Sequence, residues 1–298
     1  MICGGIDLGG TKIEARIFEG PAANTAQVQR IPTPTTSFDA MLDGLSEQID
    51  WLVASSASPE MPIGIAVPGI VDPETGIVFA ANIPTDPKRS IAADLAQRHN
   101  RPFALVNDCM AFTLSEADGG AAGAYQTVMG LILGTGVGGG FAINRALAPR
   151  HGAIAVEIGH VGIPAAAIAR HDLPLWPCGC GRLGCMETCV SGTGLSNIAA
   201  HKLGQRLDAM DLVAGGHHDI IDIWADIAGE CLLTIQLTLA PDCIVLGGGV
   251  SNLPGITARL SAAMKSHALG DMPLPDIVLA RHGDSSGARG AALVAARQ

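Results

Sequence analysis

The chain has 298 residues, 48% of them hydrophobic, and a formal net charge of −10 at pH 7. This length can bury one large core or two average ones, and the hydrophobic content excludes a disordered protein. The acidic balance argues against nucleic acid and anionic membranes as partners. No uncharged apolar run reaches the roughly eighteen residues that span a bilayer, and the N-terminus lacks a secretory pattern. We therefore expect a cytoplasmic protein.

Short apolar strands alternate with helical stretches along the chain, which predicts an α/β fold. The expected elements are, in chain order, a strand pair around a glycine turn at 4–18, a helix capped by Ser37 that reaches Leu52, a strand at 63–71, a strand and helix at 103–117, a second strand pair at 127–144, a long helix at 219–240, a strand at 243–246 and a final helix within 285–298. The repeated strand–turn–strand unit suggests two related lobes with a ligand between them.

Three glycine-rich segments follow predicted strands: the first glycine turn (residues 7–12), the second glycine turn (133–140) and the third glycine run (247–249). Glycines at a turn let backbone N–H groups approach a phosphate, and ligands bind at strand ends in open α/β sheets. The first turn alone reads more simply as a β-hairpin. The three together favour a nucleotide.

Three cysteines in a C-x-C-x4-C pattern, Cys178, Cys180 and Cys185, indicate a metal site. Tetrahedral zinc needs a fourth ligand, for which His160 and Cys189 compete. A dithiol redox role would leave the third cysteine unexplained.

Acidic residues stand at two other informative places. Asp108, with Asn107, ends a strand, where a carboxylate could accept a hydroxyl proton and the amide could orient that hydroxyl; a helix cap is the competing interpretation. Glu157 and His160 are three residues apart and would share one side of a helical turn.

These motifs together resemble the ROK family (repressor, open reading frame, kinase). The matching segments are "GIDLGGTK", "GIAVPGIVDPETG", "VNDCMAF", "LILGTGVGGG", "EIGHVGI", "CGCGRLGCMETCVSGTGL" and "VLGGGVSN", which follow in order over almost the whole chain. Further segments, among them "LPLWPCGCG" and "ARHGDSSGARGAA", resemble the N-acetylglucosamine kinase branch. Fructokinases with mannokinase activity share some of them.

The resemblance implies an actin-like (ribonuclease H-like) two-lobed α/β fold with the active site in the cleft between the lobes. It implies a small lobe at 1–108, joined by a C-terminal helix at 288–298, and a large lobe at 109–287 that contains the zinc site. It also implies a homodimer.

The activity implied is ATP-dependent phosphorylation of the 6-hydroxyl of N-acetyl-D-glucosamine, with fructokinase, mannokinase or glucokinase activity as the alternatives. Asp108 would be the general base, and Mg²⁺ would accompany ATP. The implied ATP-binding residues are Asp7, Gly9, Gly10, Thr11, Lys12, Gly134, Thr135, Gly136, Gly247, Gly248 and Gly249. The implied sugar-binding residues are Asn82, Asn107, Asp108, Glu157, His160 and Glu187.

The implied zinc ligands are His160, Cys178, Cys180 and Cys185. Four protein ligands leave no open position for water, so this zinc would be structural and would place Glu187 against the sugar.

The sequence departs from the family pattern in two places. Val156 stands where glycine is usual before the sugar-binding glutamate, and Cys109 and Met110 follow Asp108 where Ala and Asn are usual. A repressor is the less favoured function, because the first glycine turn begins by residue 7 and leaves no room for a preceding DNA-binding domain. A non-catalytic sugar sensor would have no need of Asp108.

Overall fold

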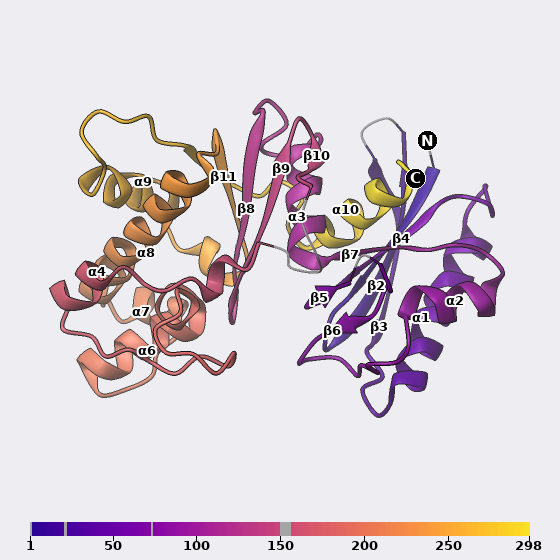
Figure 1. The fold of residues 1–298 in the computed structure, drawn as a ribbon, viewed down its shortest axis with the longest axis horizontal. Helices are drawn as coiled ribbons and strands as arrows, with labels where there is room; N and C mark the ends of the chain where they lie inside the picture. Colours follow the sequence, from indigo (N-terminus) through magenta and orange to yellow (C-terminus); the bar gives the residue numbers. More distant parts are fainter. Residues whose placement is uncertain (1, 21–22, 73, 150–155) are drawn as a thin grey trace. The chain divides into compact units, whose positions relative to one another are not determined.

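The computed structural model describes residues 2–20, 23–72, 74–149 and 156–298 (Figure 1). The chain divides into two compact units. The first unit comprises Met1–Gly120, Arg145–Ala155 and Asp284–Gln298, and the second comprises Ala121–Asn144 and Val156–Gly283.

The first unit contains a five-stranded sheet with the order β3-β2-β1-β4-β7. In it β1 pairs antiparallel with β2, and β1, β4 and β7 run parallel. The elements of the described residues are β1 (Ile2–Leu8), β2 (Lys12–Glu19), β3 (Asn24–Pro32), α1 (Phe38–Ser55), β4 (Ile63–Val67), β5 (Ile70–Val71), β6 (Val78–Phe79), α2 (Ile91–His99), β7 (Ala104–Asn107), α3 (Asp108–Ala117) and α10 (Ser286–Ala295).

Helix α1 has the start and the apolar face that its sequence predicts. The Ser37 side chain accepts a hydrogen bond from the Ala40 N–H at 3.1 Å and caps the helix. The apolar residues at helical spacing are all buried and join the core of the sheet: Met41, Leu42, Leu45, Ile49 and Leu52.

Helix α10 lies directly on the backbone of the sheet, because glycines at the contact leave no side chain between them. A Cβ on Gly5 of β1 would lie 1.9 Å from the Ala288 carbonyl oxygen, and one on Gly64 of β4 would lie 1.9 Å from that of Ala291. Figure 1 shows α10, in yellow, beside α3. The buried Arg289 side chain also holds α10 to α3, since its Nη1 donates to the Ser115 carbonyl oxygen at 2.6 Å.

The first segment of the first unit ends at Gly120, twelve residues after the end of the small lobe that the family resemblance implies, residue 108. Helix α3 belongs to the first unit because it packs tightly on α10. A Cβ on Gly290 would lie 1.8 Å from the Ala111 carbonyl oxygen, so this contact is also between backbones.

The second unit is built on four strands of one sheet, in the order β9-β8-β11-β12. Its core gathers around Trp224, which is fully buried and donates from its indole N–H to the Val190 carbonyl oxygen at 3.0 Å. The remaining elements of the described chain are β8 (Thr127–Leu133), β9 (Val137–Ile143), β10 (Ala146–Leu147), η1 (Ile158–His160), α4 (Ala165–Arg170), α5 (Glu187–Val190), α6 (Gly192–Leu203), α7 (Ala209–Ala214), α8 (His218–Leu239), β11 (Cys243–Gly247), η2 (Gly249–Asn252), α9 (Ile256–Ser266), β12 (Asp276–Leu279) and η3 (Gly283–Ser285).

The two sheets share one strand pattern. In each, a hairpin closes at a glycine turn, and its first strand pairs in parallel with a later strand: β1 with β4, and β8 with β11. The α/β class and the paired glycine hairpins predicted from the sequence are confirmed.

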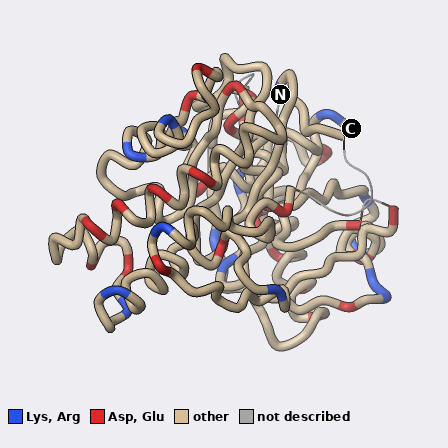
Figure 2. The backbone as a smooth tube through the Cα atoms, turned by 60° about the vertical axis from the view of Figure 1, so that its left-hand side comes forward, with Lys and Arg blue, Asp and Glu red and all other residues tan. Residues whose placement is uncertain are grey.

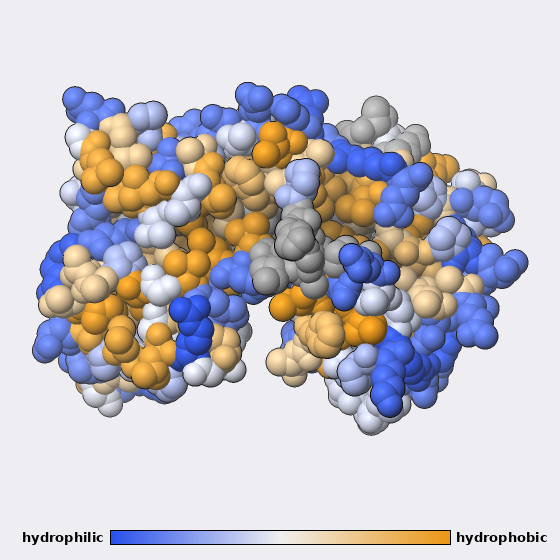
Figure 3. Space-filling model, in the orientation of Figure 1, coloured by the Kyte–Doolittle hydropathy of each residue, from blue (hydrophilic) through white to orange (hydrophobic). Residues whose placement is uncertain are grey.

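Charged residues are spread along the described backbone, with no basic stretch (Figure 2). In the face drawn in Figure 3, hydrophilic and apolar side chains are interspersed over both units. Among the described helices, none combines the length and apolar character that a bilayer-spanning segment requires.

Candidate functional site

The first glycine turn closes the β1–β2 hairpin and supports the loop that carries Asn82. The Gly9 N–H donates to the Lys12 carbonyl oxygen at 2.9 Å, which closes the turn. A Cβ on Gly10 would lie only 2.7 Å from the Asn82 carbonyl oxygen. Gly10 therefore lets the Asn82 loop rest on the turn, and two groups of predicted site residues meet within the first unit.

Asp7, at the end of β1, is an acid in an unfavourable environment for charge. Burial raises its pKa to about 7, and the nearby carboxylates of Asp108, Glu14 and Asp284 add to the rise, while Lys12 opposes it. A cation bound beside Asp7 would offset this repulsion. The clustering fits a site for a metal ion that accompanies phosphate.

Glu14, which was not identified from the sequence, lies beside Lys12, the last residue of the first glycine turn. Its carboxylate is almost fully buried and accepts hydrogen bonds from Arg16 Nε at 2.5 Å and from Arg30 Nε. Lys12 Nζ lies 3.5 Å from the same carboxylate. Burial opposes ionisation of Glu14, yet the two arginines lower its pKa. Glu14 thus stays charged and holds Lys12 beside the first glycine turn.

Asp108 begins α3 at the carboxyl end of β7, and its carboxylate is oriented by its neighbours. Asp108 Oδ1 accepts from the Cys109 N–H at 2.8 Å and from Asn107 Nδ2 at 3.0 Å. Burial raises the pKa of Asp108, and these hydrogen bonds limit the rise. A partly desolvated carboxylate with a raised pKa is a better proton acceptor than an exposed one.

Asn107 is a helix cap, as the competing interpretation of the sequence held. Its side-chain oxygen accepts from the Cys109 and Met110 N–H groups at 3.0 and 3.1 Å. Its amide nitrogen also donates to the Gly69 carbonyl oxygen at 2.7 Å. The same side chain therefore caps α3 and orients Asp108.

In the second unit, the second glycine turn and the third glycine run come together. Gly248 has φ of +84°, and a Cβ there would lie 2.5 Å from the Leu133 carbonyl oxygen. Only glycine fits both this left-handed backbone and this approach. Gly247 ends β11, and Gly249 begins η2.

A pocket of about 550 Å³ opens beside these glycines, within the size range of small-ligand sites. It brings together three predicted ATP-binding residues, Gly134, Thr135 and Gly249. The other lining residues were not identified from the sequence: Gly192, Thr193, Ser196, Arg206, Asp208, Ala209, Met210 and Val250. The "SGTG" run at 191–194, a capped helix start, was the available signal for the first two.

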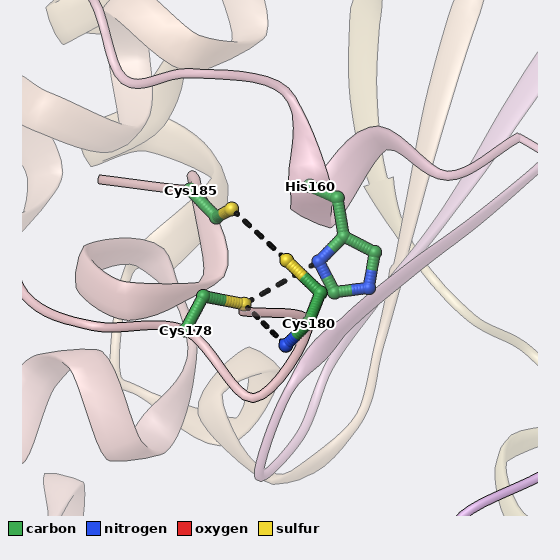
Figure 4. A group of neighbouring side chains, drawn as sticks. All are labelled: His160, Cys178, Cys180 and Cys185. Carbon is green, nitrogen blue, oxygen red and sulfur yellow. Dashed lines mark hydrogen bonds between the residues drawn. The ribbon is translucent and has the colours of Figure 1, made fainter. Parts of the chain in front are cut away.

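His160, Cys178, Cys180 and Cys185, the metal cluster, point toward one another (Figure 4). Their ligand atoms all lie within 4.8 Å of one another. The Cys178 Sγ is 3.5 Å from His160 Nδ1, and the Cys180 Sγ is 3.6 Å from the Cys185 Sγ. All eight cysteines are free thiols.

The metal cluster fits zinc. Ligands at about 2.3 Å for sulfur and 2.0 Å for nitrogen around a tetrahedral ion lie about 3.5–3.8 Å apart, which matches the two distances above. Three thiolates and one imidazole also favour zinc over ions that prefer oxygen. Cys189, the competing fourth ligand, is fully buried and lies outside the cluster.

The predicted sugar-binding residues of the second unit lie at this cluster. His160 turns Nδ1 toward the sulfurs and has Nε2 4.0 Å from Glu157 Oε2. Glu187 Oε1 accepts from the Cys178 thiol at 2.9 Å. Val156 pairs with Gly139 in an isolated antiparallel bridge, an extended conformation that suits a β-branched residue.

Comparison with known proteins gives the family of this chain. The profile of the ROK family matches residues 3–298. The chain is 42% identical to the N-acetylgalactosamine kinase AgaK of Shewanella sp. (strain ANA-3) over 97% of this chain and 95% of that protein. It is 38% identical to the N-acetyl-D-glucosamine kinase of Salmonella typhimurium over 97% and 98% of the two chains.

Solved structures show the same fold. The ROK hexokinase from Thermus thermophilus superposes with a TM-score of 0.85 at 28% identity, covering 99% of this chain and 98% of that chain. The ROK family glucokinase from Streptomyces griseus superposes with a TM-score of 0.79 at 23% identity over the whole of both chains. The fold is thus the actin-like α/β fold of ROK sugar kinases, and this chain belongs to the ROK family.

Proposed function

We propose that this protein is an ATP-dependent kinase that phosphorylates the 6-hydroxyl of N-acetyl-D-glucosamine. The observation that carries the proposal is Asp108, a partly desolvated carboxylate at the end of β7 that Asn107 and the Cys109 N–H hold in one orientation. The names of the relatives at 38–42% identity support a kinase of N-acetylated hexosamines.

Asp108 acts as the general base. A primary hydroxyl is a weak nucleophile, so Asp108 accepts its proton as the oxygen attacks the γ-phosphorus in line. The raised pKa of Asp108 suits this task, because the carboxylate must hold the proton once it has been transferred. Asn82 and Asn107 of the same unit contribute to orienting the sugar.

ATP binds through the glycine turns. In the first unit, backbone N–H groups of the first glycine turn, with Thr11 and Lys12, offer donors to phosphate oxygens. In the second unit, the second glycine turn with Thr135 offers further donors, and the pocket beside Gly249 accepts the rest of the nucleotide. Asp7 would hold Mg²⁺, which would supply positive charge to the phosphoryl oxygens.

The metal cluster holds a structural zinc ion. Its four protein ligands leave no position for a reacting water, so its part is to fix the loop that carries Glu187 and the ring of His160. Glu157, His160 and Glu187 then form hydrogen bonds with sugar hydroxyls.

We further propose that the protein is a cytoplasmic homodimer. Eight cysteines without a disulfide among them suit a reducing compartment. The dimer rests on the family resemblance alone, and the mass measured by light scattering in solution tests it.

N-Acetyl-D-galactosamine is the second candidate substrate, because the relative named for that sugar is 42% identical to this chain. The two sugars differ in the configuration at C4, so a hydrogen bond to the C4 hydroxyl decides between them. A site that hydrogen-bonds this hydroxyl discriminates strongly against the epimer.

A coupled assay of ADP release with a panel of sugars tests the proposed function. We expect kcat/KM to be highest for N-acetyl-D-glucosamine, at least about tenfold above glucose, mannose and fructose. A preference for N-acetyl-D-galactosamine would favour the second candidate. Sugar binding without turnover would overturn the kinase assignment and indicate a sensor.

A further inference from the structure

The carboxylate of Glu187 lies between the metal cluster and the second glycine turn. Its Oε1 accepts from the Cys178 thiol at 2.9 Å and lies 3.7 Å from His160 Nδ1. Cys178 loses this proton when it binds a metal as a thiolate, so in the metal-loaded protein Glu187 is positioned by its place two residues after Cys185 rather than by this hydrogen bond. Its Oε2 is 3.4 Å from the Val137 N–H, at the start of β9. A Cβ on Gly136 would lie 2.8 Å from the same Oε2, so the turn approaches Glu187 as closely as its glycine allows.

The segments that carry the metal ligands also contact this turn through their backbones. A Cβ on Gly159, the residue before His160, would lie 2.2 Å from the Val137 carbonyl oxygen. The Gly192 N–H, just after α5, donates to the Gly134 carbonyl oxygen at 2.8 Å. The turn is thus held on three sides by η1, by Glu187 and by the start of α6.

The two ligand-bearing segments are joined to each other next to these contacts. Gly162 forms an antiparallel bridge with Cys185, and the Met186 N–H donates to the Val161 carbonyl oxygen at 2.8 Å. A metal ion that binds His160 and Cys185 therefore restrains the two segments that the second glycine turn contacts. A turn so rich in glycine has wide conformational freedom and takes its shape from such contacts.

We propose that Glu187 is a positioning residue that couples the metal cluster to the second glycine turn, so that metal binding organises the nucleotide phosphate site. The inference rests on the proposed function, because it takes this turn to bind the phosphates of ATP. It adds that the metal acts on the nucleotide even when no sugar is present.

Calorimetric titration with the ATP analogue AMPPNP, without sugar, tests the coupling. We expect the metal-loaded protein to bind AMPPNP about fivefold or more tightly than protein stripped by a chelator. Because coupling between two sites is reciprocal, AMPPNP must raise the zinc affinity by the same factor. Competition with a chromogenic chelator measures that second quantity independently of catalysis.

Variants separate the coupling from a loss of folding. Glu187→Ala leaves all four metal ligands in place, so it should retain zinc, lose AMPPNP affinity and abolish the reciprocal effect. Glu187→Gln should restore part of the affinity, because its amide oxygen still accepts from the Val137 N–H. Cys189→Ala is the matched control, since this buried thiol is two residues beyond Glu187 but outside the metal cluster.

Two results bear on the inference differently. Equal AMPPNP affinity in metal-loaded protein, stripped protein and Glu187→Ala overturns the coupling and leaves the proposed kinase intact. No AMPPNP binding by the metal-loaded wild type overturns the proposed function, and the inference fails with it.

Discussion

The carboxylate of Asp108 is held in one orientation, because its Oδ1 accepts hydrogen bonds from two donors. Replacing it by an amide keeps the shape of the side chain and removes its ability to take a proton. We therefore expect Asp108→Asn to lower kcat by about 10²-fold or more, while sugar affinity changes little. Steady-state kinetics and equilibrium sugar binding measure the two effects, and near-normal turnover would refute the assignment of the base.

Asp7 gives the folded protein an unusual dependence on pH. Its pKa is raised from 3.8 to about 7, so the folded state binds this proton more tightly than the unfolded chain does. The protonated Asp7 side chain therefore contributes stability to the folded state that is fully present below about pH 4 and is lost as the pH rises through about 7. Asp7 therefore lowers the stability of the nucleotide-free protein at alkaline pH.

Asp7→Asn should remove this loss. We expect the variant to gain about 4 kcal/mol in free energy of unfolding over wild type at pH 8, because the shift is about three pKa units at about 1.4 kcal/mol each, and much less at pH 4. Urea denaturation without Mg²⁺ at both pH values measures the difference. Asp43→Asn, at an exposed position of α1, controls for the loss of one negative charge. An equal gain at both pH values would contradict the pKa shift.

At the scale of elements, the position of α10 depends on the absence of side chains at two strands. Gly5 and Gly4 are neighbours on β1 with opposite environments: Gly5 faces the rigid backbone of α10, and Gly4 faces the side-chain ends of Ile63, Leu52 and Met61 at 3.1–3.3 Å. A methyl group at Gly5 must displace the helix, whereas flexible side chains can adjust around one at Gly4.

We expect Gly5→Ala to lower the free energy of unfolding by about 3 kcal/mol or more and Gly4→Ala by about 1 kcal/mol. Thermal or urea unfolding of the two variants provides the measurement. Similar costs would show that α10 can move away from the sheet without penalty.

Local patterns predicted the elements whose signals are local. The hydrophobic spacing and the Ser37 cap predicted α1, and the glycine turns between apolar strands predicted both hairpins. The C-x-C-x4-C spacing predicted a metal site at Cys178, Cys180 and Cys185, whose sulfur atoms converge in the structure, whereas the choice of His160 over Cys189 came from the family resemblance. For α1, the hairpins and the three cysteines, the physical cause lies in neighbouring residues of the sequence.

Features that depend on distant segments could not be predicted in this way. Nothing local in β2 indicates that Glu14 is paired with Arg30 across the sheet. Arg206 and Met210 lie in a polar stretch, and only the fold brings them to the pocket beside Gly249. The contact between α10 and Gly5 joins residues 283 positions apart, Gly5 and Ala288, and a glycine in a strand can equally mark a bulge or a bend.

At the scale of the molecule, each unit has a hydrophobic core of its own, and the metal cluster lies in the second unit only. Removing the metal should therefore loosen the second unit selectively. We expect chelation to increase amide hydrogen exchange in peptides from 156–203, with little change in peptides from β1, β2 and α1. Exchange with mass-spectrometric detection measures this, and equal increases in both units would argue against a local structural role.

The docking of α10 between β1, β4 and α3 also bears on the order in which a nascent chain can fold. A ribosome completes every segment of the second unit before it reaches α10. One face of the first unit's sheet therefore lacks α10 until residues 284–298 emerge. During synthesis, the part of the protein made first is thus the part that matures last.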